Sequence, residues 1–61
     1  MSKAFIRDNN DGTWSTLFTD RKGETRHISR FIWHEESQFK ALEYANVINE
    51  RVKLNPYYEP I

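Results

Sequence analysis

The chain has no cysteine, only two glycines and two prolines, and no long run of apolar residues. Without cysteine, it can form neither a disulfide nor a thiolate zinc site. Two histidines, His27 and His34, are too few for a closed metal site, so we expect no metal and no other cofactor. No segment is long and apolar enough for a membrane span or a signal peptide, which favours a soluble, cytoplasmic protein.

A charge excess of either sign is also absent, because nine Lys and Arg residues balance nine Asp and Glu residues. A clear basic excess would be the strongest sequence evidence for nucleic-acid binding, and the chain does not have it. The charges are nevertheless distributed unevenly, with a small basic excess before residue 31 and a small acidic excess after it. Either these charges only hydrate the surface, or the basic half faces phosphate.

With 61 residues, the chain makes one domain near the lower size limit for independent folding. Its stability must come from a compact core, from a partner or from self-association. The initial Met1 indicates a complete small gene product.

The two glycines end two turns of the same kind, Asn9-Asn10-Asp11-Gly12 and Asp20-Arg21-Lys22-Gly23. Each turn begins with Asn or Asp and ends with Gly, which predicts a type I turn followed by a glycine at positive φ. In hairpins this is the turn-plus-bulge loop. The residues between the turns are rich in β-branched and aromatic types, so we predict a three-stranded meander. Its strands are expected at Lys3–Asp8, Thr13–Thr19 and Glu24 to about Ile32.

A helix is predicted from about Glu35 to Lys53, because apolar residues recur there in steps of three and four. The expected core stripe is Phe39, Leu42, Ala45, Ile48 and Val52, with Ala41 beside it. Asn55-Pro56 should end the helix, since the residue before a proline disfavours helical geometry. The predicted fold is therefore α+β, a βββα domain over residues 1–54 with an extended tail at 55–61.

The register of the strands decides which sheet face carries the core, because a slip of one residue exchanges the faces. The turn-plus-bulge loops pair Asn9 with Thr13, and Asp20 with Glu24. One face then holds Ala4, Ile6, Trp14, Thr16, Phe18, Ile28 and Ile32, together with Arg26 and Arg30. This face should take the helix, with Trp14 as the buried anchor. The other face holds Phe5, Arg7, Ser15, Leu17, His27, Ser29, Phe31 and Trp33.

A single helix cannot cover this second face, and small monomers rarely leave an apolar patch open without a use. Three explanations remain open. Tyr57 and Tyr58 of the tail fold back over it, or a protein partner or second copy binds it, or nucleic acid binds it through aromatic stacking and the charge of Arg7. The candidate partner-binding residues are Phe5, Arg7, Ser15, Leu17, His27, Ser29 and Phe31.

Several short motifs support a family resemblance: Asp11-Gly12-Thr13-Trp14, Lys22-Gly23-Glu24-Thr25-Arg26, an aromatic-to-helix junction at Phe31 to Glu36, and Ala41-x-x-Tyr44-Ala45-x-x-Ile48. Over residues 4 to 50 the chain resembles the arm-type DNA-binding domains of phage tyrosine recombinases and the plant ethylene-response-factor domain. The resemblance implies that the second face enters a major groove, with contacts from Arg7, Ser15, Leu17, His27 and Ser29. Those families place several arginines there, whereas Leu17 and Phe5 suit an apolar partner better than base edges.

Catalytic motifs are missing. Gly12 and Gly23 are isolated turn glycines and form no phosphate-binding loop. Ser29, His27 and Glu24 lie on one strand and cannot converge as a catalytic set, because alternation places Glu24 on the face opposite to His27 and Ser29. We therefore expect a small non-enzymatic binding module, of the accessory type that phages encode. It should modulate a protein partner, in the cytoplasm of a host, through Phe5, Leu17, His27 and Phe31. DNA binding by the same face is the alternative, and neither a membrane nor a small-molecule substrate is expected.

Overall fold

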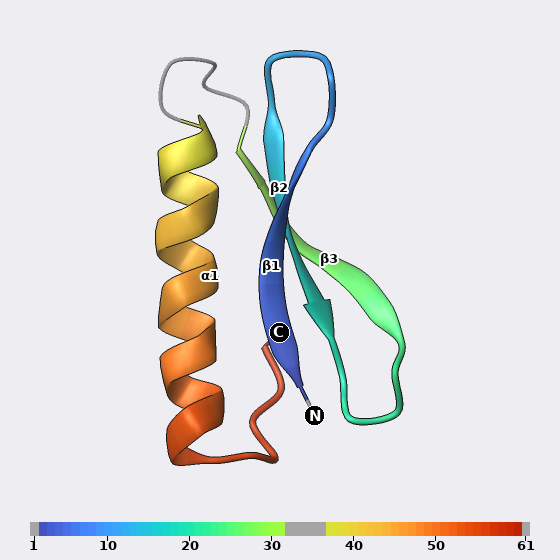
Figure 1. Ribbon diagram of the computed structural model, residues 1–61, viewed down its shortest axis with the longest axis vertical. Coiled ribbons are helices and arrows are strands. Elements are labelled where there is room, and N and C mark those ends of the chain that lie inside the picture. The colour runs from blue at the N-terminus through green and yellow to red at the C-terminus, as the bar shows by residue number, and fades with distance from the viewer. Residues whose placement is uncertain (1, 32–36, 61) are drawn as a thin grey trace.

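The computed structural model describes residues 2–31 and 37–60, and of Arg30 and Phe31 only the backbone. Three antiparallel strands form one sheet in the order β1-β2-β3, and one helix follows them (Figure 1). The elements are β1 (Lys3–Asp8), β2 (Trp14–Thr19), β3 (Thr25–Phe31) and α1 (Ser37–Leu54). The predicted α+β fold class is confirmed. The predicted helix start at Glu35 lies outside the described residues.

Both hairpin loops have the predicted register and a glycine at positive φ, but the first is not the predicted type I turn, because Asn10 at its second position has a φ of 63° where that turn needs about −60°. The N–H of Asn9 donates to the carbonyl of Thr13 at 3.1 Å, and that of Asp20 donates to Glu24 at 2.9 Å. Gly12 and Gly23 have φ angles of 85° and 90°, which only glycine adopts without strain. The first loop therefore sets the register of β1 against β2 as expected.

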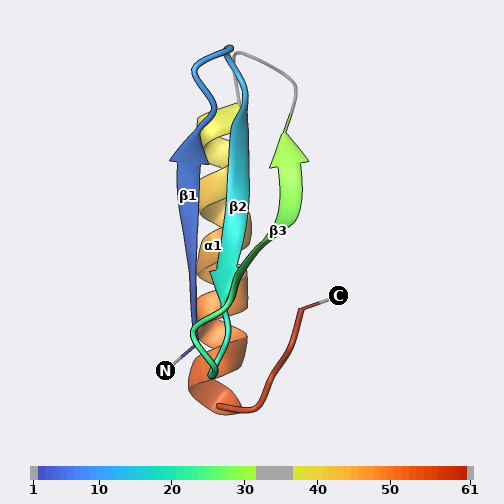
Figure 2. The same ribbon diagram turned by 90° about the vertical axis from the view of Figure 1, so that its right-hand side faces the viewer.

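The core lies between the sheet and α1, on the face that the alternation predicted. Its buried apolar side chains are Ala4, Phe18, Ala45, Ile48 and Val52, with Ile6, Ile28, Tyr44 and Tyr58 packed around them. Figure 2 shows α1 behind β1 and β2, with β3 extending past its flank. The hydroxyl of Thr16 donates to the carbonyl of Ala41 at 2.9 Å, which places that side chain against the helix.

A side-chain amide joins the helix to the edge strand β1. Asn49 Oδ1 accepts from the N–H of Ala4 at 2.8 Å, and Asn49 Nδ2 donates to the carbonyl of Ala4 at 3.0 Å. Because β1 is an edge strand, these two backbone groups have no strand to pair with on that side. The Asn49 amide takes the place of a neighbouring strand at this position.

Two expectations about the core are wrong. Phe39 and Leu42 are 66% and 47% exposed, while the buried helix residues are Ser37, Ala41, Ala45, Ile48 and Val52. The buried stripe is thus rotated toward small residues, which let the helix approach the sheet closely. Trp14 is only half-buried, and Phe18, which is fully buried, is the aromatic anchor.

An extra residue in β3 divides the sheet into two registers. Leu17 pairs with His27 as predicted, but Thr16 pairs with Ser29, so Ile28 has no partner on β2. Such a bulge turns the following residues to the opposite face. Ile28 packs against the core, and Ser29 shares the helix side with Thr16.

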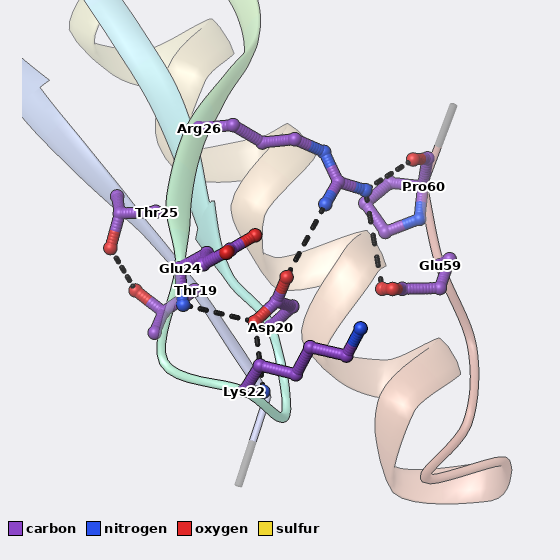
Figure 3. A network of polar contacts seen from close by, with 8 residues as sticks. All are labelled: Thr19, Asp20, Lys22, Glu24, Thr25, Arg26, Glu59 and Pro60. Atoms are coloured by element: carbon purple, nitrogen blue, oxygen red, sulfur yellow. Dashed lines mark hydrogen bonds and ion pairs between the residues drawn. The ribbon is translucent and has the colours of Figure 1, made fainter.

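The C-terminal tail returns along the helix side of the sheet beneath β3 and does not cover the other face. Tyr58 packs against the core, and Arg26 Nη2 donates to the carbonyl of Pro60 at 2.9 Å. Arg26 also lies 4.0 Å from carboxylate oxygens of both Asp20 and Glu59 (Figure 3). The first of the three explanations for the uncovered face is therefore wrong.

Within the described residues, no helix has both the length and the apolar character that a membrane crossing requires.

Candidate functional site

The face of the sheet opposite α1 is here called the open face. Its strand positions with described side chains are Lys3, Phe5, Arg7, Ser15, Leu17, Thr19, Thr25 and His27. These residues are cross-strand neighbours, since Phe5 pairs with Leu17, Arg7 with Ser15, and Leu17 with His27. Thr19 and Thr25 are joined by their hydroxyls at 2.8 Å. Figure 2 views the sheet from this side.

Leu17 lies at the centre of the open face but is only 6% exposed, although no helix covers it. Its register partners on the two outer strands are Phe5 and His27. Directly paired side chains approach closely enough to cover each other. Among the apolar side chains of this face that the structure describes, Phe5 is 38% exposed and accessible, whereas Leu17 is not.

Ser15 is also buried, at 2% exposure, because a loop side chain folds over it. Asn9 Nδ2 donates to Ser15 Oγ at 2.9 Å and to Thr13 Oγ1 at 3.2 Å. A polar group without access to water needs such a partner. Ser15 therefore supports the first loop, and a bound partner cannot reach it directly.

Arg7 and His27 meet above β2, where Arg7 Nη2 lies 2.8 Å from His27 Nε2. Both residues are exposed. The Nε and Nη2 atoms of Arg7 also donate to Asn9 Oδ1, each at 3.3 Å. The two charge-bearing residues predicted for this face are thus brought together by the fold.

The bulge removes Ser29 from the predicted site. Ser29 lies on the helix side, and its hydroxyl oxygen is buried without a hydrogen-bond partner in the part of the chain that the structure describes. The backbone of Phe31 pairs with Trp14, and that of Arg30 with Ser15. The side chain of Phe31, like the whole of Trp33 and His34, lies outside the described residues.

A shallow concavity of about 690 Å³ lies at the end of the open face next to the first loop. It is lined by Arg7, Asp8, Asn9, Asn10, Ser15 and His27. Sequence reasoning missed Asn9 and Asn10, because turn residues were used only to set register. The observation that could have found Asn9 is that its amide follows β1 two residues after Arg7 in sequence.

The concavity offers hydrogen-bond donors and positive charge, with one carboxylate, Asp8, at its edge. The side chain of Asp8 accepts from the backbone N–H of Asn10 at 2.8 Å. Ser15 and His27 are engaged with Asn9 and Arg7 respectively, so they do not form a nucleophile–base pair. Among residues 2–31 and 37–60, no three His, Cys, Asp or Glu side chains are grouped to hold a metal ion.

Comparisons with known proteins found no family model, no curated protein and no solved structure that matches this chain.

Proposed function

We propose that the protein is a non-enzymatic binding module whose open face binds the phosphate backbone of a nucleic acid. The observation that carries this proposal is the charge of the face. Lys3 and Arg7 are exposed there, Arg7 in contact with His27, and none of its described strand positions is Asp or Glu. Backbone phosphates are bound mainly by Arg and Lys, with polar side chains in support.

Burial of Leu17 also supports this partner. The expected apolar partner was to contact Phe5, Leu17 and Phe31 beside His27; Leu17 is not accessible, and the side chain of Phe31 lies outside the described residues. Protein interfaces depend on a few well-buried anchors, often aromatic, and Phe5 alone offers little area. The resemblance to arm-type DNA-binding domains implies the same face and the same class of partner.

Salt dependence tests the proposal. Binding of a fluorescently labelled DNA duplex, measured by anisotropy over a salt series, should weaken steeply as salt rises, because phosphate contacts release counterions. Arg7→Ala should reduce the slope of log K against log salt by about one. Lys40→Ala is the matched control, because it removes the same charge from an exposed helix position. If both variants reduce the slope equally, the slope reflects the net charge of the protein, and the open face is not the binding site.

A protein partner is the second candidate, since Phe5 is a large aromatic residue exposed next to Leu17. An accessory module that modulates another protein would use Phe5 as its anchor. Phe5→Ser should then abolish capture of the partner in a pull-down, with and without nuclease, and leave DNA affinity unchanged. If capture is lost only on nuclease treatment, the nucleic acid is the bridging partner.

A further inference from the structure

Three alternate residues of the edge strand β1, Lys3, Phe5 and Arg7, form a row along the open face, here called the β1 row. All three side chains are exposed, and the aromatic residue lies between the two cations. Lys3 and Arg7 are four residues apart in sequence, which corresponds to about 13 Å along an extended strand. The β1 row therefore presents positive charge on both sides of an aromatic ring.

The two cations of the β1 row have no carboxylate partner of their own. Among the described residues, neither Lys3 nor Arg7 forms an ion pair. Arg26 on the helix side, by contrast, lies 4.0 Å from carboxylate oxygens of Asp20 and Glu59. Because Lys and Arg form strong charge-assisted hydrogen bonds with phosphate, Lys3 and Arg7 can bind an incoming phosphate without first losing an ion pair.

Phe5 is accessible but supplies only one ring. Its side chain is 38% exposed, whereas that of its cross-strand partner Leu17 is 6% exposed. A protein interface depends on a cluster of buried anchors, but a single exposed ring is enough to stack one nucleobase. Stacking uses the flat face of a base, which an intact duplex keeps between neighbouring base pairs. The Phe5 ring is therefore suited to a single strand and not to a duplex.

We propose that the β1 row binds single-stranded DNA, with one base stacked on Phe5 and with phosphates on either side contacted by Lys3 and Arg7. The strand follows β1 and reaches the concavity beside the first loop at Arg7, where the exposed amide of Asn10 can donate to phosphate or sugar oxygens. Neither a stacked base nor a bound phosphate requires a 2′-hydroxyl group, so DNA satisfies every contact. The inference rests on the proposed function and narrows its partner to a single strand.

Three labelled ligands test the inference with the native protein. A single-stranded oligonucleotide of mixed sequence, measured by anisotropy, should bind about fivefold or more tightly than a duplex of the same length, a factor that one stacked base supplies. A strand with abasic sites in place of its bases keeps the phosphates and cannot stack. It should bind about fivefold or more weakly than the normal strand.

Phe5→Leu removes the ring and keeps an apolar side chain beside Leu17, so the fold should remain, which circular dichroism checks. The affinity of this variant for the normal strand should fall about fivefold or more, and abasic sites should then cause no further loss. Phe39→Leu is the matched control, because it removes a ring that is 66% exposed on α1, away from the open face. This control should bind both strands as the native protein does.

The possible failures are distinguishable. Equal affinity for the normal and the abasic strand, or a duplex that binds as tightly as the single strand, overturns the inference and leaves the proposed function intact, because that function needs only phosphate contacts. An equal loss in Phe39→Leu overturns the role of Phe5. Tighter binding of an RNA strand of the same sequence overturns the assignment to DNA. No binding of any strand or duplex overturns both the inference and the proposed function.

Discussion

The two faces of the one sheet are covered in different ways, although the same three strands supply both. On the helix side, Phe18 is fully buried by residues of α1 and by the returning tail. On the open face, Leu17 is 6% exposed, and its register partners there are Phe5 and His27 of the same sheet. Burial of a central strand residue therefore does not show that a further layer lies over it.

The difference lies in which side chains provide the cover. The helix side is covered by apolar groups distant in sequence, and their contact with Phe18 stabilises the fold through the hydrophobic effect. Phe5 and His27 flank Leu17 on the open face, and Arg7 reaches His27 across β2. Long polar side chains can cover apolar surface with their stems while their polar ends remain in water. On the open face Leu17 is thus shielded from water, while Arg7 and His27 remain exposed.

The largest expected effect is on the helix side. Phe18→Ala should lower the free energy of unfolding by about 3 to 5 kcal/mol, the usual cost of truncating an aromatic side chain in a core. In so small a domain this is a large part of the total stability. Urea denaturation followed by tryptophan fluorescence measures it. A loss no greater than that of Trp14→Ala would contradict the assignment of Phe18 as the anchor.

A smaller loss is expected at the centre of the open face. Leu17→Ala should cost about 2 kcal/mol, at the lower end for a buried leucine, because surface neighbours can collapse into the space. Leu17→Ser should lower the free energy of unfolding further, whereas substitution of an exposed residue would change it little. The same denaturation experiment applies. Should Leu17→Ser melt as the native protein does, the cover provided by Phe5 and His27 is not maintained in solution.

The two hydrogen bonds between Asn49 of α1 and Ala4 of β1 should contribute less to stability than the burial of Leu17 does. Asn49→Ala removes two hydrogen bonds to the backbone of Ala4 and should cost about 1 kcal/mol, since water reaches this edge. Asn46→Ala, on the exposed part of the same helix, is the matched control and should change stability by less than about 0.5 kcal/mol. Amide hydrogen exchange at Ala4 should accelerate in the first variant alone.

The second hairpin loop should lose stability in acid, because the carboxylate of Asp20 accepts two backbone N–H groups there. The backbone N–H of Glu24 lowers the pKa of Asp20 below its ordinary value of 3.8; the N–H of Lys22 and the charge of Arg26 act in the same direction, and burial opposes them. Because the folded pKa lies below the unfolded one, this stabilisation is present above pH 3.8 and is lost as pH falls through the folded value.

Thermal melting between about pH 5 and pH 2 measures this loss, and Asp20→Asn should show less of it because the amide oxygen still accepts both N–H groups without titrating. If the melting temperature of Asp20→Asn falls with pH as steeply as that of the native protein, the titration of Asp20 does not cause the loss.

The sequence predicted those parts of the fold that depend on local chemistry. Gly12 and Gly23 mark turns that need positive φ, and alternation from the first turn placed Phe18 toward the helix and Phe5 away from it. It could not predict the burial of Leu17, which depends on the side-chain conformations of residues on other strands. Nor could it predict that Phe39 is exposed, because the choice between two overlapping helical stripes depends on how closely the helix approaches the sheet.

By itself, the sequence determined the order of the elements, the two turn glycines at positive φ and the register of β1 on β2, because each follows from a few neighbouring residues. The tertiary structure decided which of the predicted residues stay in the candidate site and which loop residues join them. The bulge at Ile28 has no glycine to mark it, and it arises where packing of Ile28 into the core competes with a regular ladder. That extra residue moves Ser29 to the helix side. It leaves Arg7 and His27, residues of two different strands, in contact across β2.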